Sequence, residues 1–154
     1  MKFKLVRECK EKKITLSSCE SLTAGLFTST IASVPGASAV LKGGFVTYFT
    51  EMKNKLAHVD QSIIDQYGVV SKECAYAMAY NTREITDSDY CVSFTGNAGP
   101  STMEGKPAGL VYCAIASKEN TEVYQFQLNG MSRNELRQYL VDTMIEKLLK
   151  KIEE

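Results

Sequence analysis

The sequence lacks tryptophan and has a single histidine, His58. One histidine excludes a His-rich zinc or iron site, and a Ser-His-Asp triad would have to use His58 itself. His58 follows the helical stretch EMKNKLA, where a polar capping or surface role is the simpler interpretation. Hydrolytic chemistry in this chain is therefore expected to use a base other than histidine, and no metal ligands are predicted.

The sequence has neither an excess of charge nor a long apolar run. Its 18 basic and 18 acidic residues give a net charge of 0, whereas general binders of nucleic acid or membrane surfaces carry a basic excess. No apolar stretch approaches the ~20 residues of a membrane span. The first residues, MKFKLVRECKEKK, are too charged for a secretory signal. We therefore expect a cytoplasmic protein that binds neither nucleic acid nor membrane.

The cysteines form no Cys-x-x-Cys pair, and their number is odd. They are Cys9, Cys19, Cys74, Cys91 and Cys113. Without an export signal they are expected to be reduced thiols, mostly buried as small hydrophobic residues. The 154 residues, of which 44% are hydrophobic and 23% charged, predict one folded domain over 1–154.

The spacing of apolar residues predicts helices mixed with strands. Helices are expected over 3–12, 22–33, 51–57, 60–68, about 15 residues from Ser71, and 132–152, and strands over 14–18, 43–50, 90–95, 109–117 and 122–129. The strands at 90–95 and 109–117 are nearly continuous apolar runs, which is typical of strands covered on both faces. The strand at 122–129 alternates, as an edge strand does, and offers a surface for homo-oligomer formation. Together these elements predict an α/β layer architecture with helices on both faces of the sheet.

The segment ESLTAG (20–25) lies between a predicted strand and a predicted helix, where such sheets place ligands. Free N–H groups at the start of a helix favour a developing oxyanion, so Ser21 is well placed to attack a carbonyl. The amides near Leu22 and Thr23 would then form the oxyanion hole. The alternative is that Ser21 and Thr23 only cap the helix. Glu20 would hold a substrate hydroxyl or, in the alternative, bond to nearby backbone amides.

A second segment, GGFVTYFTEMK (43–53), places Tyr48 near a strand end and Lys53 in the next helix. Five residues across such a turn are able to bring both side chains to one pocket. A partly desolvated lysine can lose its proton and act as a general base for serine. Taken alone, Lys53 is interpreted as a surface lysine and Tyr48 as a core aromatic, so the catalytic interpretation depends on convergence with Ser21.

Two further segments carry polar or glycine-rich patterns. TGNAGP follows an apolar strand, and its small residues let backbone N–H groups approach an anion; it lacks the Walker and dinucleotide-binding patterns. Its candidate ligand residues are Thr95, Gly96, Asn97, Ala98 and Gly99, and Lys106 would reach back to the same anion. At the start of the last helix, Arg133 and Arg137 share one face, which suits a phosphate or a solvated surface.

Taken in order, these segments resemble the CinA C-terminal domain family, whose characterised enzymes are the nicotinamide mononucleotide deamidases called PncC. The matching stretches are ESLTAGL, GGFVTY with a lysine five residues after the tyrosine, VVSKECAYAMA, TGNAGP, KPAGLVY and SRNELR. The resemblance covers roughly residues 5–148. It implies a three-layer α/β/α sandwich with a mixed, largely buried sheet.

The resemblance also implies an activity, which is hydrolysis of the nucleotide's carboxamide to nicotinate mononucleotide and ammonia without a metal or other cofactor. Ser21 matches the family's nucleophile, and Tyr48 and Lys53 match its tyrosine and base lysine. The TGNAGP segment matches its ligand loop, and Arg137 matches a position assigned to the substrate phosphate. The implied partner is thus a small pyridine nucleotide.

Several residues depart from the family pattern. Ala24 replaces a glycine, Phe49 and Thr50 replace a small hydroxyl residue and asparagine, Asn97 makes the ligand loop more polar, and Ser132 stands where aspartate is common. Two hypotheses follow. Either the chain is an active amidohydrolase, or it is a diverged member that binds a nucleotide or a protein without catalysis. A third, weaker alternative is a structural subunit.

Overall fold

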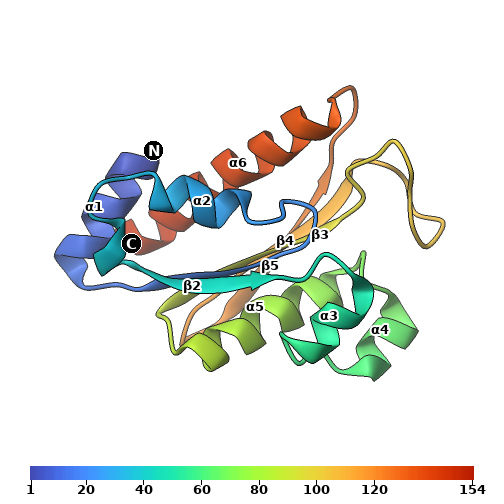
Figure 1. Cartoon of the computed structure of the whole chain (residues 1–154), viewed down its shortest axis with the longest axis horizontal. Coiled ribbons are helices and arrows are strands. Elements are labelled where there is room, and N and C mark those ends of the chain that lie inside the picture. Colours follow the sequence, from blue (N-terminus) through green and yellow to red (C-terminus); the bar gives the residue numbers. More distant parts are fainter.

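A mixed five-stranded sheet forms the centre of the structure, a computed structural model that describes residues 1–154 (Figure 1). Its strands are β1 (Leu16–Glu20), β2 (Leu41–Val46), β3 (Tyr90–Gly96), β4 (Leu110–Ala116) and β5 (Thr121–Gln127), in the order β2-β1-β3-β4-β5. The strand β1 runs parallel to β2 and β3, whereas β4 is antiparallel to both β3 and β5. The predicted mixed sheet is therefore confirmed, with β2 and β5 at its edges.

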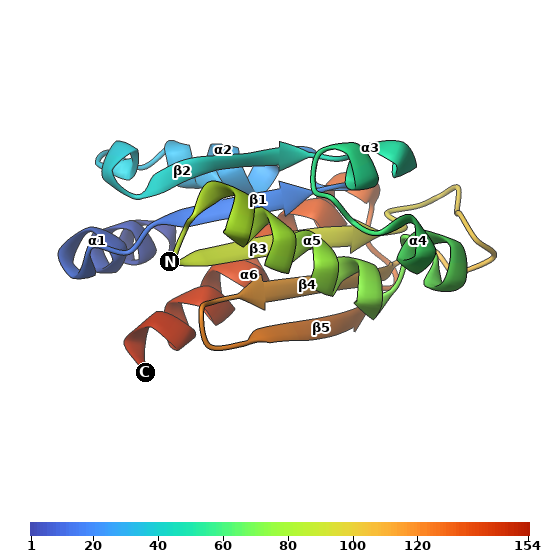
Figure 2. The ribbon, with the colours of Figure 1, turned by 90° about the horizontal axis from the view of Figure 1, so that it is seen from below.

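Helices cover both faces of this sheet, which confirms the predicted three-layer α/β/α architecture. On one face lie α1 (Lys2–Lys12), α2 (Leu26–Ala32) and α6 (Arg133–Glu153), and on the other α3 (Thr50–Lys55), α4 (Gln61–Tyr67) and α5 (Lys72–Thr86) (Figures 1 and 2). A short 3-10 turn, Ala37–Ala39, leads into β2. No helix combines the length and the apolar character that crossing a membrane requires.

The two long helices have clear start signals in the sequence. The Ser71 hydroxyl accepts a hydrogen bond from the Cys74 amide and caps α5. At α6, Ser132 and Glu135 form a reciprocal capping box, which satisfies two backbone donors of the first turn. Ser132 therefore does here what the aspartate common at this position would also do as a helix cap.

The core divides between the two faces of the sheet. The face under α1, α2 and α6 holds a cluster of 23 buried hydrophobic residues, including Phe27, Phe94 and Leu140. The opposite face, under α5, holds separate clusters of nine and four. All five cysteines are free and buried, as predicted.

Several predicted elements have shifted ends; the first strand, predicted over 14–18, lies at Leu16–Glu20. Two further shifts concern the candidate site. The strand predicted over 43–50 leaves the sheet after Val46, so Thr47, Tyr48 and Phe49 form the connection to α3. The helix predicted over 22–33 begins only at Leu26, because Ala24 and Gly25 adopt positive φ angles of 46° and 96° that interrupt a right-handed helix. Residues 21–25 are consequently a tight loop at the carboxyl end of β1.

Burial along the edge strand β5 alternates as predicted except at Val123 and Tyr124, which are both half-buried. Its outer backbone groups have no neighbouring strand, since β5 is the last strand of the sheet. Association of two copies through this edge stays a prediction.

Candidate active site

Ser21 and Lys53 meet at the carboxyl ends of the parallel strands, although 32 residues separate them in the sequence. The Lys53 amine, Nζ, donates to the Ser21 hydroxyl, Oγ, over 3.0 Å, and to the carbonyl of Thr47 over 2.7 Å. Ser21 directly follows β1, and its own amide is held by the carbonyl of Phe94 on the neighbouring strand β3. Strand pairing therefore fixes the serine, and the first turns of α3 fix the lysine.

Lys53 lies in an environment that disfavours its charge. The residue has 0% of its surface exposed, and none of the salt bridges in the structure involves it. Burial lowers the pKa of Lys53 below the ordinary 10.5, and more distant charges oppose this only in part. A lowered pKa makes the neutral amine available, and only that form can accept a proton from Ser21.

The thiols of Cys74 and Cys19 would raise the pKa of Lys53 if they were ionised. Burial raises the pKa of Cys74 to about 12, and burial also raises the pKa of Cys19 above its usual range. Both thiols therefore stay protonated at neutral pH and supply no anion that would hold the lysine in its charged form.

Two backbone amides beside Ser21 are free. The N–H groups of Leu22 and Thr23 donate to no group of the protein, whereas the next amide, that of Ala24, donates to the Ser21 carbonyl over 3.0 Å. Leu22 and Thr23 are also buried. Free, buried N–H groups next to a nucleophile are the donors that an oxyanion hole needs.

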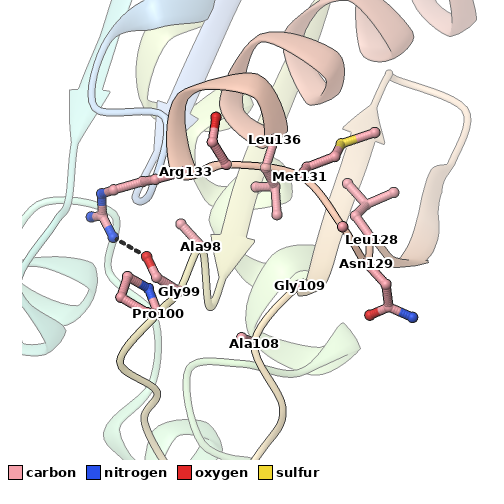
Figure 3. A pocket seen from close by; sticks show the side chains of 12 residues that line it. Ala98, Gly99, Pro100, Ala108, Gly109, Leu128, Asn129, Met131, Arg133 and Leu136 are labelled. Atoms are coloured by element: carbon pink, nitrogen blue, oxygen red, sulfur yellow. Dashed lines mark hydrogen bonds between the residues drawn. The ribbon is translucent and has the colours of Figure 1, made fainter.

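The Ser21 hydroxyl opens into a cavity of about 160 Å³. Its lining consists of Ser21, Leu22, Tyr48, Gly96, Asn97, Ala98, Ser101, Met103 and Arg133. A second cavity, of about 320 Å³, shares Ala98 and Arg133 with the first and extends along the start of α6 (Figure 3). In Figure 3 the guanidinium of Arg133 reaches over to the Gly99 carbonyl, to which it donates over 2.8 Å. Arg133 thus stands at the junction of the two cavities.

Tyr48 lies at the rim of the smaller cavity, with about half (51%) of its surface exposed. Its hydroxyl accepts a hydrogen bond from Arg133 over 2.5 Å. Toward Lys53 it presents its backbone carbonyl, at 3.5 Å from Nζ. The structure therefore brings Tyr48 to the site, but its hydroxyl bonds to an arginine and not to the lysine or the serine.

Glu20 is placed away from the cavities. Its carboxylate is fully buried and accepts hydrogen bonds from the amides of Phe27 and Thr28 over 2.9 and 3.0 Å, and from the Thr28 hydroxyl over 2.8 Å. These amides belong to the first turn of α2, where the helix dipole favours a negative charge. Glu20 therefore anchors α2, as the alternative interpretation held, and does not face a substrate.

The glycine-rich segment divides into residues that line the cavities and residues that hold the loop from behind. Gly96, Asn97 and Ala98 line the smaller cavity, and Ala98 and Gly99 line the larger. Gly96 allows the close approach of β4, because a Cβ atom there would lie 2.5 Å from the Leu110 carbonyl. The Asn97 amide group bonds to Met103 and Lys106, and so shapes the loop that follows.

Thr95 and Lys106 lie behind the loop. The Thr95 hydroxyl donates to the Val69 carbonyl. The Lys106 amine donates to the carbonyls of Tyr67 and Val70 and pairs with Glu104. The expected reach of Lys106 toward an anion is therefore not seen, because its amine is engaged by the turn before α5.

Arg137 is also engaged by the backbone. Its Nε donates to the Leu22 carbonyl over 2.9 Å and its Nη2 to the Thr23 carbonyl over 3.0 Å. Neither cavity is lined by Arg137. The arginine at the cavities is Arg133, and the sequence signal that pointed to it was the pair of arginines on one face of the helix.

The comparison with known proteins agrees with this arrangement. A sequence profile described as the CinA C-terminal domain matches residues 1–152. The chain belongs to the CinA C-terminal domain family. It is 48% identical over 128 residues to a protein of Geobacillus sp. (strain WCH70), covering 82% of this chain and 31% of that protein. It is 45% identical over 132 residues to a protein of Listeria welshimeri, covering 85% and 32%. Both are named as competence-damage inducible proteins, and the chain spans about a third of their length.

Solved structures of the CinA superfamily share the fold. The competence/damage inducible protein CihA from Agrobacterium tumefaciens superposes with a TM-score of 0.90 at 28% identity, covering 100% of this chain and 97% of that one. A CinA superfamily protein from Escherichia coli gives 0.92 at 27% identity, covering 96% and 86%. The α/β/α sandwich is therefore the CinA fold over the whole length of this chain.

The structure gives a physical account of one departure from the CinA pattern. Ala24 stands where the pattern has glycine, and its φ of 46° lies in the left-handed region that glycine adopts without strain. The side chain is exposed, so the added methyl group does not crowd the site. The consequence of the substitution is backbone strain in the loop after Ser21.

Proposed function

We propose that this CinA domain hydrolyses the carboxamide of nicotinamide mononucleotide to nicotinate mononucleotide and ammonia. The observation that carries the proposal is the 3.0 Å hydrogen bond from the Lys53 amine to the Ser21 hydroxyl. A lysine that is fully buried, has no carboxylate partner and touches a serine is the arrangement that serine activation needs. The single histidine, His58, has no part in it.

The first half of the reaction forms an acyl-enzyme. Neutral Lys53 takes the proton of Ser21, and Oγ attacks the carboxamide carbon. The carbonyl oxygen gains the negative charge and is held by the free amides of Leu22 and Thr23. Lys53 then passes its proton to the nitrogen, the C–N bond breaks, and ammonia leaves.

The second half releases the product. A water molecule gives a proton to neutral Lys53, and its oxygen attacks the acyl carbon to form a second tetrahedral intermediate. When that intermediate collapses, the Ser21–acyl bond breaks, Oγ regains its proton from Lys53, and the nicotinate carboxylate departs. Throughout, the Thr47 carbonyl accepts a hydrogen bond from the Lys53 amine over 2.7 Å and so holds the amine beside the Ser21 hydroxyl.

The two joined cavities support a substrate with a small reactive end and a larger remainder. The smaller cavity, about 160 Å³, contains Ser21, and the larger, about 320 Å³, extends along the N-terminus of α6. Arg133 at their junction and the positive end of the helix dipole favour an anionic group there. A pyridine ring at Ser21 with a sugar phosphate beyond Arg133 fits this order. Tyr48, bonded to Arg133, would act as a wall of the site and a brace for that arginine.

The test is release of ammonia and nicotinate mononucleotide by the purified chain, followed by an enzyme-coupled assay and by chromatography. Ser21→Ala should abolish both products. Ser29→Ala, an exposed serine on the neighbouring helix α2 with no hydrogen bond from its side chain, is the matched control and should keep wild-type activity. Unchanged turnover in Ser21→Ala would remove the serine from the mechanism.

A second candidate is a domain that binds a nucleotide or protein without turnover. It is favoured by two adjacent exposed aromatic side chains next to the lysine helix, Tyr48 and Phe49, with 51% and 68% of their surfaces exposed. This candidate predicts a rise in melting temperature on addition of nicotinamide mononucleotide with no product formed. Turnover that depends on Lys53 would exclude it.

A further inference from the structure

We propose that Arg137 is a positioning residue for the oxyanion-holding amides, and not a ligand of the substrate phosphate. The inference rests on the proposed function, because an oxyanion forms only if Ser21 attacks a carbonyl. The observation behind it is a pair of hydrogen bonds. The guanidinium donates to two consecutive carbonyls of the loop after Ser21, those of Leu22 and Thr23, over 2.9 and 3.0 Å.

Every nitrogen of the Arg137 guanidinium donates to a group of the protein. Besides the two carbonyl bonds from Nε and Nη2, its remaining nitrogen, Nη1, donates to the Asn134 side chain over 3.0 Å. All three nitrogens therefore already have an acceptor within the protein. Two of the five N–H donors of the guanidinium remain, one on Nη1 and one on Nη2, but Arg137 lines neither cavity in which a substrate would lie.

Peptide geometry connects these carbonyls to catalysis. The carbonyl of Leu22 and the N–H of Thr23 belong to one planar peptide group and point in opposite directions. A cation fixed on the carbonyl side holds that plane in place and draws electron density toward the oxygen, which makes the N–H a stronger donor. That N–H is one of the two free amides beside Ser21. Arg137 thus acts on the oxyanion through the peptide and does not touch the substrate.

The loop needs such support because its own backbone holds it weakly. Ser21 and Gly25, at the two ends of the loop, are bonded to Phe94 and Ser29, but between them the backbone bonds are only those from the Ala24 amide to the Ser21 carbonyl and from the Leu26 amide to the Thr23 carbonyl. Ala24 also carries a left-handed φ of 46°, which disfavours this conformation in isolation. Arg137 attaches the loop to α6, an element packed firmly against the sheet.

The two arginines of α6 therefore have separate tasks. Arg133 lines both cavities and is the one available to an anionic part of the substrate. Arg137, four residues later and one turn deeper, supports the loop that holds the oxyanion. The two roles can therefore be distinguished by comparing a substrate that has a phosphate with one that lacks it.

The experiment compares nicotinamide mononucleotide with nicotinamide riboside, which has no phosphate, in Arg137→Ala and Arg137→Lys. A positioning role predicts that Arg137→Ala lowers kcat/KM for both substrates by the same factor, about 100-fold, mainly through kcat. Added guanidinium ion should restore part of the activity with both substrates. Arg7→Ala, which removes an exposed arginine of α1 that makes no hydrogen bond or salt bridge, is the control and should behave as wild type.

Two outcomes overturn the inference. One is wild-type kcat in Arg137→Ala, and the other is a loss confined to the phosphate-bearing substrate and expressed in KM. Thermal unfolding shows whether Arg137→Ala is folded. If it is not, Arg137→Lys is used for the test, since a lysine keeps the charge and can donate to one of the two carbonyls. Its expected loss is smaller and again equal for the two substrates.

A second readout separates this inference from the proposed function. A fluorophosphonate probe reacts with an activated serine, forming an Oγ–P bond while the P–F bond breaks and fluoride leaves, and mass spectrometry reports the labelled Ser21. If the wild type is labelled but does not hydrolyse the nucleotide, the substrate proposal fails. The inference then stands if Arg137→Ala slows labelling about 100-fold, and it fails if labelling is unchanged. A wild-type Ser21 that is neither labelled nor catalytic overturns both proposals.

Discussion

The two faces of the sheet are built by different means. Beneath α1, α2 and α6, one cluster of 23 apolar side chains fills the layer. Beneath α5, the apolar clusters are small, and polar side chains reach into the layer. Ser93 and Thr95, both on β3, donate from there to the carbonyls of Ala75 and Val69. The buried Lys53 lies at the end of this second layer.

This difference shows how one small domain combines stability with a reactive site. Burial of apolar area supplies most of the free energy of folding and needs no exact geometry. Hydrogen bonds between buried polar groups add little net free energy, but they fix positions closely. The apolar face therefore supports the fold, and the polar face holds a lysine whose burial lowers the stability of the protein.

The largest effect that would sharpen this comparison is expected from Lys53→Met. The substitution removes the general base and should lower kcat by about 1,000-fold or more, while the folded protein at pH 7 becomes at least as stable as the wild type, because no charge is buried. Assays of ammonia release and thermal unfolding check the two parts. Lys55→Met, an exposed lysine of the same helix, should change neither by much.

The stability difference between wild type and Lys53→Met should also depend on pH. The pKa of Lys53 is lowered in the folded state, so the unfolded chain binds more protons between that pKa and the ordinary value of 10.5. Stability of the wild type therefore rises with pH across this window, and the advantage of Lys53→Met shrinks and is lost above it. An advantage that grows toward high pH would contradict the burial of a charged lysine.

On the apolar face, Leu140→Ala should lower stability by about 3 kcal/mol through the lost burial and the cavity left behind. Leu140 is fully buried in the large cluster. Below the melting temperature, kcat should stay near the wild-type value, because the site depends on the other face. The neighbouring exposed Tyr139 provides a control, since Tyr139→Ala removes a side chain with 42% of its surface exposed. Equal destabilisation by both variants would contradict the proposed role of the cluster.

On the polar face, Glu104→Gln should cost about 1–2 kcal/mol. The Glu104 carboxylate accepts the amides of Val69 and Val70 over 2.7 and 3.0 Å and ties the loop before β4 to the turn before α5. Burial alone would raise its pKa, but these amides and Lys106 lower the pKa below the ordinary 4.5. The stabilisation is therefore present above 4.5 and is lost as the pH falls through the lowered pKa.

Denaturant unfolding of Glu104→Gln at several pH values measures this effect. The variant should converge with the wild type under acidic conditions. Glu119→Gln, at an exposed position without a salt bridge, should show no such convergence, since the Glu119 carboxylate accepts no hydrogen bond from the protein. A constant difference across the pH range would mean that Glu104 acts by packing alone.

The smallest effect is expected at the loop between the two faces. Ala24→Gly should raise stability by about 1 kcal/mol, because glycine adopts the left-handed φ of 46° without strain. Ala32→Gly, at an exposed position within α2, should instead lower stability by up to about 1 kcal/mol. Thermal unfolding of both variants checks this prediction, since the change in stability should have opposite signs at the two positions.

Much of the fold could be predicted from the sequence. Each expected helix and strand exists, since the apolar spacing of 3–12 or 132–152 has one periodicity and the run at 109–117 another. Segment ends were less accurate where glycine-like backbone angles decide them, as at Ala24 and Gly25 before α2. Such angles depend on tertiary contacts that hold a strained loop in place.

The candidate site was less predictable than the fold. The sequence pointed to Ser21 and Lys53, and the structure brings them into contact. It left open whether Glu20 binds a substrate or backbone amides. It did not reveal that Lys106 holds a turn or that Arg137 donates to the backbone instead of to a ligand. In each case the residue type allows several partners, and only the folded chain selects one.

The sequence alone determined the α/β layering, the CinA resemblance and the presence of a serine and a lysine suited to amide hydrolysis, because these follow from periodicity and from the order of motifs along the chain. The tertiary structure decided that the lysine is desolvated, that two amides stay free beside the serine, and that Arg133 and not Arg137 borders the cavities. Burial and hydrogen-bond partners arise from residues far apart in sequence, and so they exist only once the chain has folded.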